Sequence, residues 1–163
     1  ALSVQKALTK HKFDTKIKWP NDIYINSKKV GGILIETLSK DKNNIVVVGI
    51  GLNVFMKSNL KIDREWTSLI LENESMSIDR NKIISDIANE LLIDKKTFEE
   101  KGFGAFSKNF NELNILKNKK VSLSNSQYDD VVALDVNKDG SLNVKKKGEI
   151  SKIFSGEVSI RLN

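Results

Sequence analysis

A short stretch near the N-terminus constrains the fold most, because it alternates apolar extended segments with residues that interrupt them. Ile17 and Trp19 predict one strand, and Ile23 and Ile25 predict a second. Between them stands Pro20-Asn21-Asp22. Proline breaks a strand ladder and Asn and Asp favour turns, so we expect Asn21 and Asp22 to lie at a bend.

The same stretch continues into a polar tip and a glycine pair. Residues 26–29, Asn-Ser-Lys-Lys, predict a hairpin connection, and Gly31-Gly32 opens the next predicted strand, at 33–38. Glycine has no Cβ, so a ligand or another backbone can approach closely there. The sequence therefore predicts that a cation, an amide, a carboxylate and bare glycine backbone lie close together in one short strand–turn–strand segment.

Three blocks resemble the signatures of biotin protein ligases. Lys-Trp-Pro-Asn-Asp at 18–22 is followed by Lys-Val-Gly-Gly-Ile-Leu at 29–34. Val-Gly-Ile-Gly-Leu-Asn-Val at 48–54 is similar to the family's Gly-Ile-Gly-Leu-Asn strand, and residues 155–161 resemble its Gly-Glu-Ile-Ser-Leu-Arg ending. The resemblance implies an α+β fold, in which part of a class II synthetase-like mixed α/β catalytic domain precedes a small SH3-like β-barrel.

One family feature has no match in this sequence. The Gly-Arg-Gly-x-x-Gly-Arg loop, which in the family closes over biotin and the adenylate, lies upstream of these blocks, and no arginine precedes Arg64. Ala1–Lys12 is predicted to be the remainder of a helix without a recognisable cap. We therefore expect the chain to be the C-terminal portion of such an enzyme, poorly active by itself.

The resemblance assigns catalytic roles to two residues. A lysine in a polar hairpin is by default a solvated residue, but the family's lysine stands where Lys29 stands and reaches the biotin carboxylate and the adenylate phosphate. Its expected role is electrostatic stabilisation of developing negative charge. Asp22 is expected to orient the acceptor lysine or help to deprotonate it, because only an unprotonated amine is nucleophilic.

Five further residues are expected to bind biotin or the adenylate. Asn21 would bind the nucleotide side, Lys18 would be a second cation near the phosphate, and Gly31 and Gly32 would offer bare backbone. Asn53 fits the adenosine pocket and fits equally well a residue that ends a strand. We predict no metal site in this chain.

The implied reaction has two steps. Biotin and ATP, with Mg²⁺ bound to the ATP, give biotinyl-5'-adenylate, which then acylates a lysine of a biotin carboxyl carrier protein such as that of acetyl-CoA carboxylase. A homodimer is expected from the family. Two alternatives remain open, a lipoate or octanoate transferase relative and a non-catalytic module that binds the carrier.

Composition narrows the other function classes. Hydrophobic residues make up 39% of the 163 residues, which supports a globular core. No apolar run approaches the roughly 20 residues that a membrane span needs, and no signal-peptide pattern is present, so we expect a cytoplasmic protein. The absence of cysteine and the single histidine, His11, leave no ordinary zinc site. His11 is expected at the surface, near the end of the first helix.

The net charge of +6 raises the question of nucleic acid. The cations are 24 lysines and only three arginines, interleaved with 21 acidic residues. No stripe of basic and aromatic residues suits base stacking. We therefore predict no nucleic-acid or membrane partner for this segment.

The rest of the chain divides by hydrophobic period. Residues 45–54 predict a buried central strand, and 57–77 an irregular segment that Trp66 and Leu69 anchor to the core. Residues 79–101 predict a helix that Asp79 caps and Gly102 ends. A shorter helix is expected through Phe106 and Phe110.

Alternating short strands follow from Val121, which predicts domains at 1–115 and 116–163. Within the second, residues 135–140 imitate the start of an EF-hand loop, but Lys146 occupies the position of its bidentate acid. We predict a hairpin turn at 137–140 instead.

Overall fold

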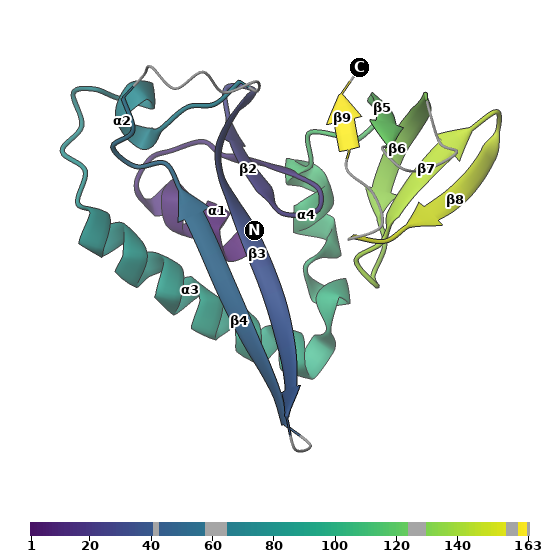
Figure 1. Cartoon of the computed structure of the whole chain (residues 1–163), viewed down its shortest axis with the longest axis horizontal. Coiled ribbons are helices and arrows are strands. Elements are labelled where there is room, and N and C mark those ends of the chain that lie inside the picture. Colours follow the sequence, from purple (N-terminus) through teal and green to yellow (C-terminus); the bar gives the residue numbers. More distant parts are fainter. Residues whose placement is uncertain (41–42, 58–64, 124–129, 156–159, 163) are drawn as a thin grey trace. The chain divides into compact units, whose positions relative to one another are not determined.

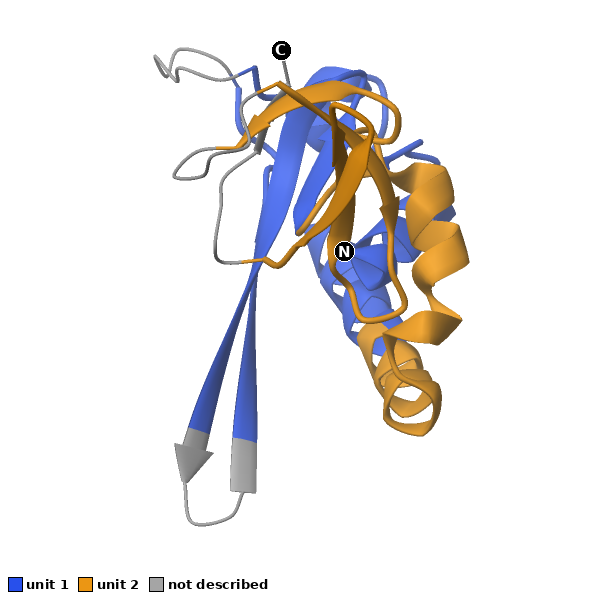
Figure 2. Cartoon of the chain, turned by 90° about the vertical axis from the view of Figure 1, so that its right-hand side faces the viewer, with its two compact units in different colours: residues 1–16, 21–90 blue, residues 17–20, 91–163 orange. Residues whose placement is uncertain are grey.

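The computed structural model describes residues 1–40, 43–57, 65–123, 130–155 and 160–162. Its residues form two compact units, which Figure 2 colours separately. The first contains residues 1–16 and 21–90, and the second contains 17–20 and 91–163. The predicted domains at 1–115 and 116–163 stay a prediction about how the family's domains divide the chain.

The first unit is built around antiparallel strands (Figure 1). After helix α1 (Leu2–Lys10) and the short strand β1 (Lys16–Lys18), β2 (Asp22–Ile25) pairs with β3 (Lys28–Lys40), which pairs with β4 (Asn43–Leu52). Since β2 has only four residues, it reaches only the first part of β3. The remainder of β3 pairs with β4 alone, as a long two-stranded ribbon.

The prediction of a buried central strand at 45–54 is wrong. Residues 45–48 are between 41% and 56% exposed, and Leu34, Ile35 and Leu38 of β3 are about equally open. The reason is topological: β4 is the last strand of its sheet among the described residues, so β3 covers one of its edges and no described strand covers the other. Apolar composition predicted the strand but not its neighbours.

Helix α3 (Arg80–Lys101) begins and ends as the sequence predicted. Asp79 accepts hydrogen bonds from the backbone N–H groups of Asn81 and Lys82, and Gly102 follows the helix with a φ of +63°. The segment before it contains an unpredicted short helix, α2 (Leu69–Glu72), whose Leu69 is fully buried as expected of an anchor. Residues 58–64 of that segment lie outside the described residues. No helix among the described residues is long and apolar enough to cross a membrane.

The inner face of α3 carries acids that pair with the end of α1. Asp86 and Glu90 are each only 8% exposed. His11 Nε2 lies 2.8 Å from Asp86, and Lys10 Nζ lies 2.6 Å from Glu90. Hydrogen bonds from Lys82 and His11 lower the pKa of Asp86, and the bond to Glu90 raises the pKa of Lys10. His11 is therefore a half-buried link between two helices rather than a free surface residue.

The second unit contains a short 3₁₀ helix η1 (Phe103–Ala105), helix α4 (Ser107–Leu113) and a five-stranded sheet in the order β8-β7-β6-β5-β9. Its strands are β5 (Lys120–Leu123), β6 (Val131–Val136), β7 (Leu142–Lys146), β8 (Glu149–Ile153) and β9 (Ile160–Leu162). These antiparallel strands confirm the prediction that the chain changes from helices to short strands from Val121 onward. The described residues show no closed barrel, and residues 156–159 of the C-terminal block lie outside them.

The turn between β6 and β7 is the predicted hairpin. Gly140 has a φ of +86°, and its N–H donates to the Asn137 carbonyl at 3.0 Å. Asp139 accepts from the backbone N–H and the hydroxyl of Ser141 and pairs with Lys152 at 3.2 Å. Each carboxylate oxygen thus has a partner within the protein. Among the described residues, no three His, Cys, Asp or Glu side chains gather into a metal site.

Asp139 gives the second unit a pH dependence. The bonds from Ser141, and then Lys152, lower the pKa of Asp139 to about 2. A carboxyl group with a lowered pKa contributes stability above its unfolded value, 3.8, and loses it as the pH falls through about 2. We expect Asp139→Asn to destabilise the chain at pH 6 but to cost much less at pH 2, as measured by urea unfolding at both values. An equal cost at both values would contradict this.

Candidate active site

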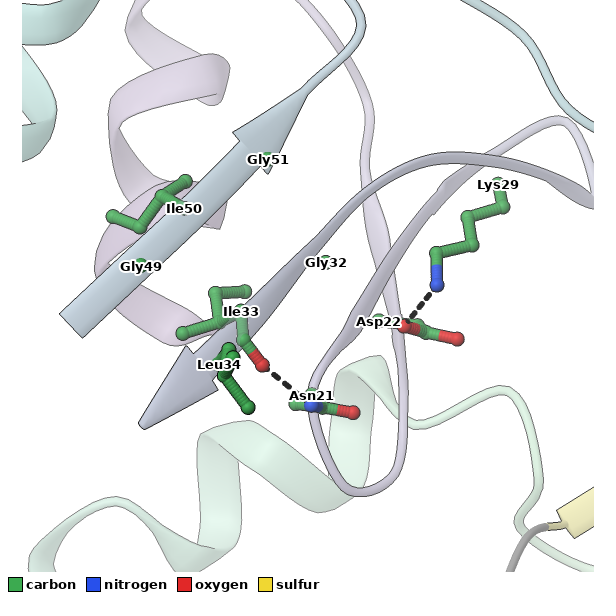
Figure 3. A pocket seen from close by; sticks show the side chains of 9 residues that line it. All are labelled: Asn21, Asp22, Lys29, Gly32, Ile33, Leu34, Gly49, Ile50 and Gly51. Atoms are coloured by element: carbon green, nitrogen blue, oxygen red, sulfur yellow. Dashed lines mark hydrogen bonds and ion pairs between the residues drawn. The ribbon is translucent and has the colours of Figure 1, made fainter. Parts of the chain in front are cut away.

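A cleft of about 460 Å³ opens in the first unit (Figure 3). Its volume lies in the range of small-molecule sites, roughly 300 to 1,000 Å³. The cleft is lined by residues from the bend at Asn21, from the start of β2, from β3 and from the last part of β4. They are Asn21, Asp22, Lys29, Gly32, Ile33, Leu34, Gly49, Ile50 and Gly51.

A β-bulge decides which lysine enters the cleft. Ile23 is opposite Gly31 but Tyr24 is opposite Lys29, so Val30 faces no partner on β2. Opposed residues of an antiparallel pair share a face, and Asp22 and Tyr24 share one because strand side chains alternate. The bulge therefore turns Lys29 to the face of Asp22. Without it, Lys29 would fall on the opposite face, with the buried Ile23.

Lys29 and Asp22 form an ion pair at the centre of the site. Lys29 Nζ lies 2.5 Å from Asp22 Oδ1, with the two side chains 34% and 19% exposed. Gly32 lies directly beside this pair, since a Cβ there would stand 3.0 Å from the Asp22 oxygen and 3.3 Å from Lys29 Nζ. A glycine at position 32 thus leaves room for the ion pair.

Asn21 forms the bend, as predicted. Its side-chain amide donates to the Ile33 carbonyl at 2.5 Å, and Ile33 N–H donates to the Asn21 carbonyl at 3.0 Å. These two bonds fasten the bend to β3, and they bring Asn21 to the cleft beside Asp22 (Figure 3).

Three other predicted residues do not line the cleft. A Cβ on Gly31 would meet the Gly51 carbonyl oxygen at 2.6 Å, so this glycine permits close strand pairing. Asn53 donates its side-chain N–H to the Thr67 carbonyl at 3.0 Å, a bond that fits a structural role. Lys18 belongs to β1, in the part of the chain that groups with the second unit.

The sequence did not predict that residues 65–67 would lie beside Lys29 and bond to its backbone. Lys29 N–H donates to the Glu65 carbonyl at 3.1 Å, and Thr67 N–H donates to the Lys29 carbonyl at 2.8 Å. Trp66, between them, forms an isolated parallel bridge with Lys29. The sequence identified Trp66 only as an apolar anchor. No local pattern shows that two segments more than thirty residues apart will pair.

The arrangement suits an anionic substrate with an apolar part. An ammonium has three N–H donors, so Lys29 can hold Asp22 and still donate to a carboxylate or a phosphate. Leu34 adds an apolar side chain on the same face of the sheet as Gly32, and Gly49 and Gly51 add bare backbone there. The residues that line the cleft therefore suit a ligand that carries a carboxylate or phosphate group beside an apolar part.

Comparison with known proteins gives the class. Residues 1–53 match the family described as the Biotin/lipoate A/B protein ligase family. Over most of its length the chain is homologous to biotin protein ligases, and biotin protein ligases are among its structural neighbours.

Three relatives show the extent of the match. The chain is 27% identical to the bifunctional ligase/repressor BirA of Escherichia coli over 150 residues, which cover 90% of the chain and 46% of that protein. It is 38% identical to the biotin–[acetyl-CoA-carboxylase] ligase of Mycobacterium tuberculosis over 78 residues, 48% of the chain and 27% of that protein. The Aquifex aeolicus biotin protein ligase in complex with biotin and ATP matches with a TM-score of 0.88 and 29% identity, covering 99% of the chain and 68% of that structure. The chain thus spans about half the length of its bacterial BirA relative.

Two of the four glycines in β3 and β4 should respond differently when they are replaced by alanine. Gly31→Ala should destabilise the chain by about 1 to 3 kcal/mol, because its Cβ would overlap a backbone oxygen that cannot move aside. Gly51→Ala is the matched control, since its nearest atom, the Gly32 oxygen, is 3.8 Å away. The urea midpoints of the two variants test this, and equal midpoints would contradict it.

Proposed function

We propose that this chain is the C-terminal portion of a biotin protein ligase, which activates biotin with ATP and transfers it to a lysine of a biotin carboxyl carrier protein. The observation that supports this best is the Lys29–Asp22 pair beside Gly32, in a cleft built from the very residues that carry the family motif.

In the first step, a carboxylate oxygen of biotin attacks the α-phosphorus of ATP. The bond between that phosphorus and the bridging oxygen breaks, and pyrophosphate leaves. Negative charge builds on the phosphoryl oxygens, and the Lys29 ammonium stabilises it without becoming covalently involved. Asp22 holds the ammonium in place, since the pair is already formed in the protein. Preorganisation of this kind means that little reorientation is needed during the reaction.

In the second step, the amine of the carrier's lysine attacks the acyl carbon, and AMP leaves. The amine must lose a proton to become a stable amide. Asp22 is the carboxylate in the cleft that can orient the incoming ammonium or accept that proton. Its partner Lys29 then stabilises the charge on the departing phosphate.

The remaining ligand contacts extend this proposal. Asn21 serves the nucleotide side, and Gly32 the approach of the adenylate. Lys18, Gly31 and Asn53 take the roles implied by the family motif, although Gly31 and Asn53 also have structural contacts. Mg²⁺ enters bound to ATP, because the described residues hold no cluster of metal-binding side chains.

The wider setting is also part of the proposal. Residues 116–163 correspond to an SH3-like barrel domain, the enzyme acts in the cytoplasm, and two copies associate as a homodimer. The carrier is the biotin carboxyl carrier protein of acetyl-CoA carboxylase, in agreement with the substrate named for the Mycobacterium tuberculosis relative.

The chain supplies one side of the site. No arginine precedes Arg64, so the arginine-containing loop of the family is not in this sequence. The open apolar ribbon of β3 and β4 supports the same reading, because large exposed apolar surfaces usually have a partner. We infer that the rest of a ligase packs on this ribbon and completes the pocket.

Complementation tests the function directly. We expect the purified chain, incubated with MgATP, biotin and an apo carrier domain, to give little biotinylation, because water reaches an unprotected anhydride. Adding a separately expressed piece of a homologous ligase that contains the arginine loop should restore it. Transfer of lipoate or octanoate instead would support the first alternative. Carrier binding without any transfer would support a non-catalytic module.

Substitutions of Lys29 and Asp22 should affect different half-reactions of the complemented enzyme. Lys29→Ala should slow adenylate formation by roughly a hundredfold, about 3 kcal/mol, since it removes one preorganised donor. Asp22→Asn should slow acyl transfer more than adenylation, because only transfer needs an activated amine. Single-turnover assays with and without the carrier measure each step. Unchanged adenylation in Lys29→Ala, or equal losses in Asp22→Asn, would refute the assigned roles.

A further inference from the structure

We infer that Glu72 is a positioning residue for Lys29, acting through Thr67 and the hairpin turn at Asn26. This inference rests on the proposed function, because it concerns the ammonium that the proposal makes electrostatic. Glu72 lies on α2 and is not among the residues that line the cleft. Its influence must therefore pass through the backbone of Lys29.

The first link in this path is the segment beside Lys29. The Glu65 carbonyl accepts from Lys29 N–H, and Thr67 N–H donates to the Lys29 carbonyl. Both polar backbone groups of Lys29 are thus held by residues 65–67. Any shift of this segment moves the point from which the lysine side chain starts.

The second link is Thr67. It is 2% exposed, and its hydroxyl donates to Glu72 Oε1 at 2.5 Å. Its carbonyl accepts from the Asn53 side chain at 3.0 Å. Thr67 is thereby fixed to α2 on one side and to the residue after β4 on the other.

The third link is the turn before Lys29. Asn26 and Ser27 have φ values of +47° and +65°, a left-handed conformation that is unusual for residues other than glycine. Asn26 Nδ2 donates to Glu72 Oε2 at 2.6 Å, so the second oxygen of the same carboxylate stabilises this turn. One side chain therefore joins the turn that precedes Lys29 to the segment that flanks it.

A carboxylate is required for this double contact. Glutamate accepts at both oxygens, whereas the amide of glutamine accepts at one and presents N–H donors at the other. Glu72→Gln therefore cannot accept from both Thr67 and Asn26. Thr67→Val removes the hydroxyl at constant shape, and Thr67→Ser keeps it. Glu74→Gln is the matched charge control, since Glu74 is exposed and lies two residues further on.

Amide hydrogen exchange in this chain tests whether Glu72 and Thr67 hold the backbone of Lys29 in place. We expect the Lys29 and Thr67 amides to exchange at least roughly tenfold faster in Glu72→Gln and Thr67→Val, because the bonds that hold them open more often. Thr67→Ser and Glu74→Gln should exchange as the parent does. Urea unfolding shows that each variant is folded. Unchanged exchange in both Glu72→Gln and Thr67→Val would overturn the inference.

Single-turnover adenylation in the complemented enzyme tests the functional half. The same two variants should lower the maximal rate roughly ten- to a hundredfold, because a displacement of about 1 Å can cost that much, with a smaller change in the biotin concentration for half-maximal rate. Thr67→Ser should restore the rate. A parental rate despite faster exchange would overturn the inference while Lys29→Ala remains impaired. No impairment even in Lys29→Ala would instead refute the proposed function, and the inference with it.

Discussion

The site depends on Val30, a residue of β3 that has no partner on β2. Because Val30 opposes nothing on β2, the alternation of side chains along β3 shifts by one position there. Val30 itself is fully buried, and Lys29 reaches the face of Asp22. A regular ladder would place a lysine among buried isoleucines, at the cost of burying a charge without a partner. The ion pair, its close approach to Gly32 and the position of the cleft all follow from this register.

Local signals predicted the local features well. The ends of α3 follow from Asp79 and Gly102, and the turn at 137–140 follows from its Asn and Gly, because each depends on a few adjacent residues. The stretch from Lys18 to Leu34 predicted that a cation, an amide, a carboxylate and bare backbone would lie together, and Asn21, Asp22, Lys29 and Gly32 all line the cleft. Their chemical roles were implied by family resemblance, not by the residues alone.

Features that depend on distant partners were not predicted. The exposure of residues 45–48 depends on which strands lie beside β4, and apolar composition does not carry that information. The acids at 86 and 90 are buried where Lys10 and His11 meet them, and the helical pattern of residues 79–101 does not show which segment packs against it. The contacts of Glu72 with Asn26 and Thr67 belong to the same class. Each requires knowing which segments meet across the fold.

The family motif also connects the two units through the chain itself. Within the second unit, the Ile17 carbonyl accepts from Ile115 N–H, and the Trp19 indole N–H donates to the Gly140 carbonyl at 2.9 Å. Trp19 is 3% exposed, as expected of a core residue. Only Pro20 separates it from Asn21, which hydrogen bonds fasten to β3 in the first unit. The segment 17–21 therefore has hydrogen-bond partners in both units. Ile17 and Trp19 bond to residues of the second unit, and Asn21 bonds to β3 of the first. The motif therefore holds residues with separate tasks, because Trp19 packs within the second unit whereas Asp22 pairs with Lys29 in the first.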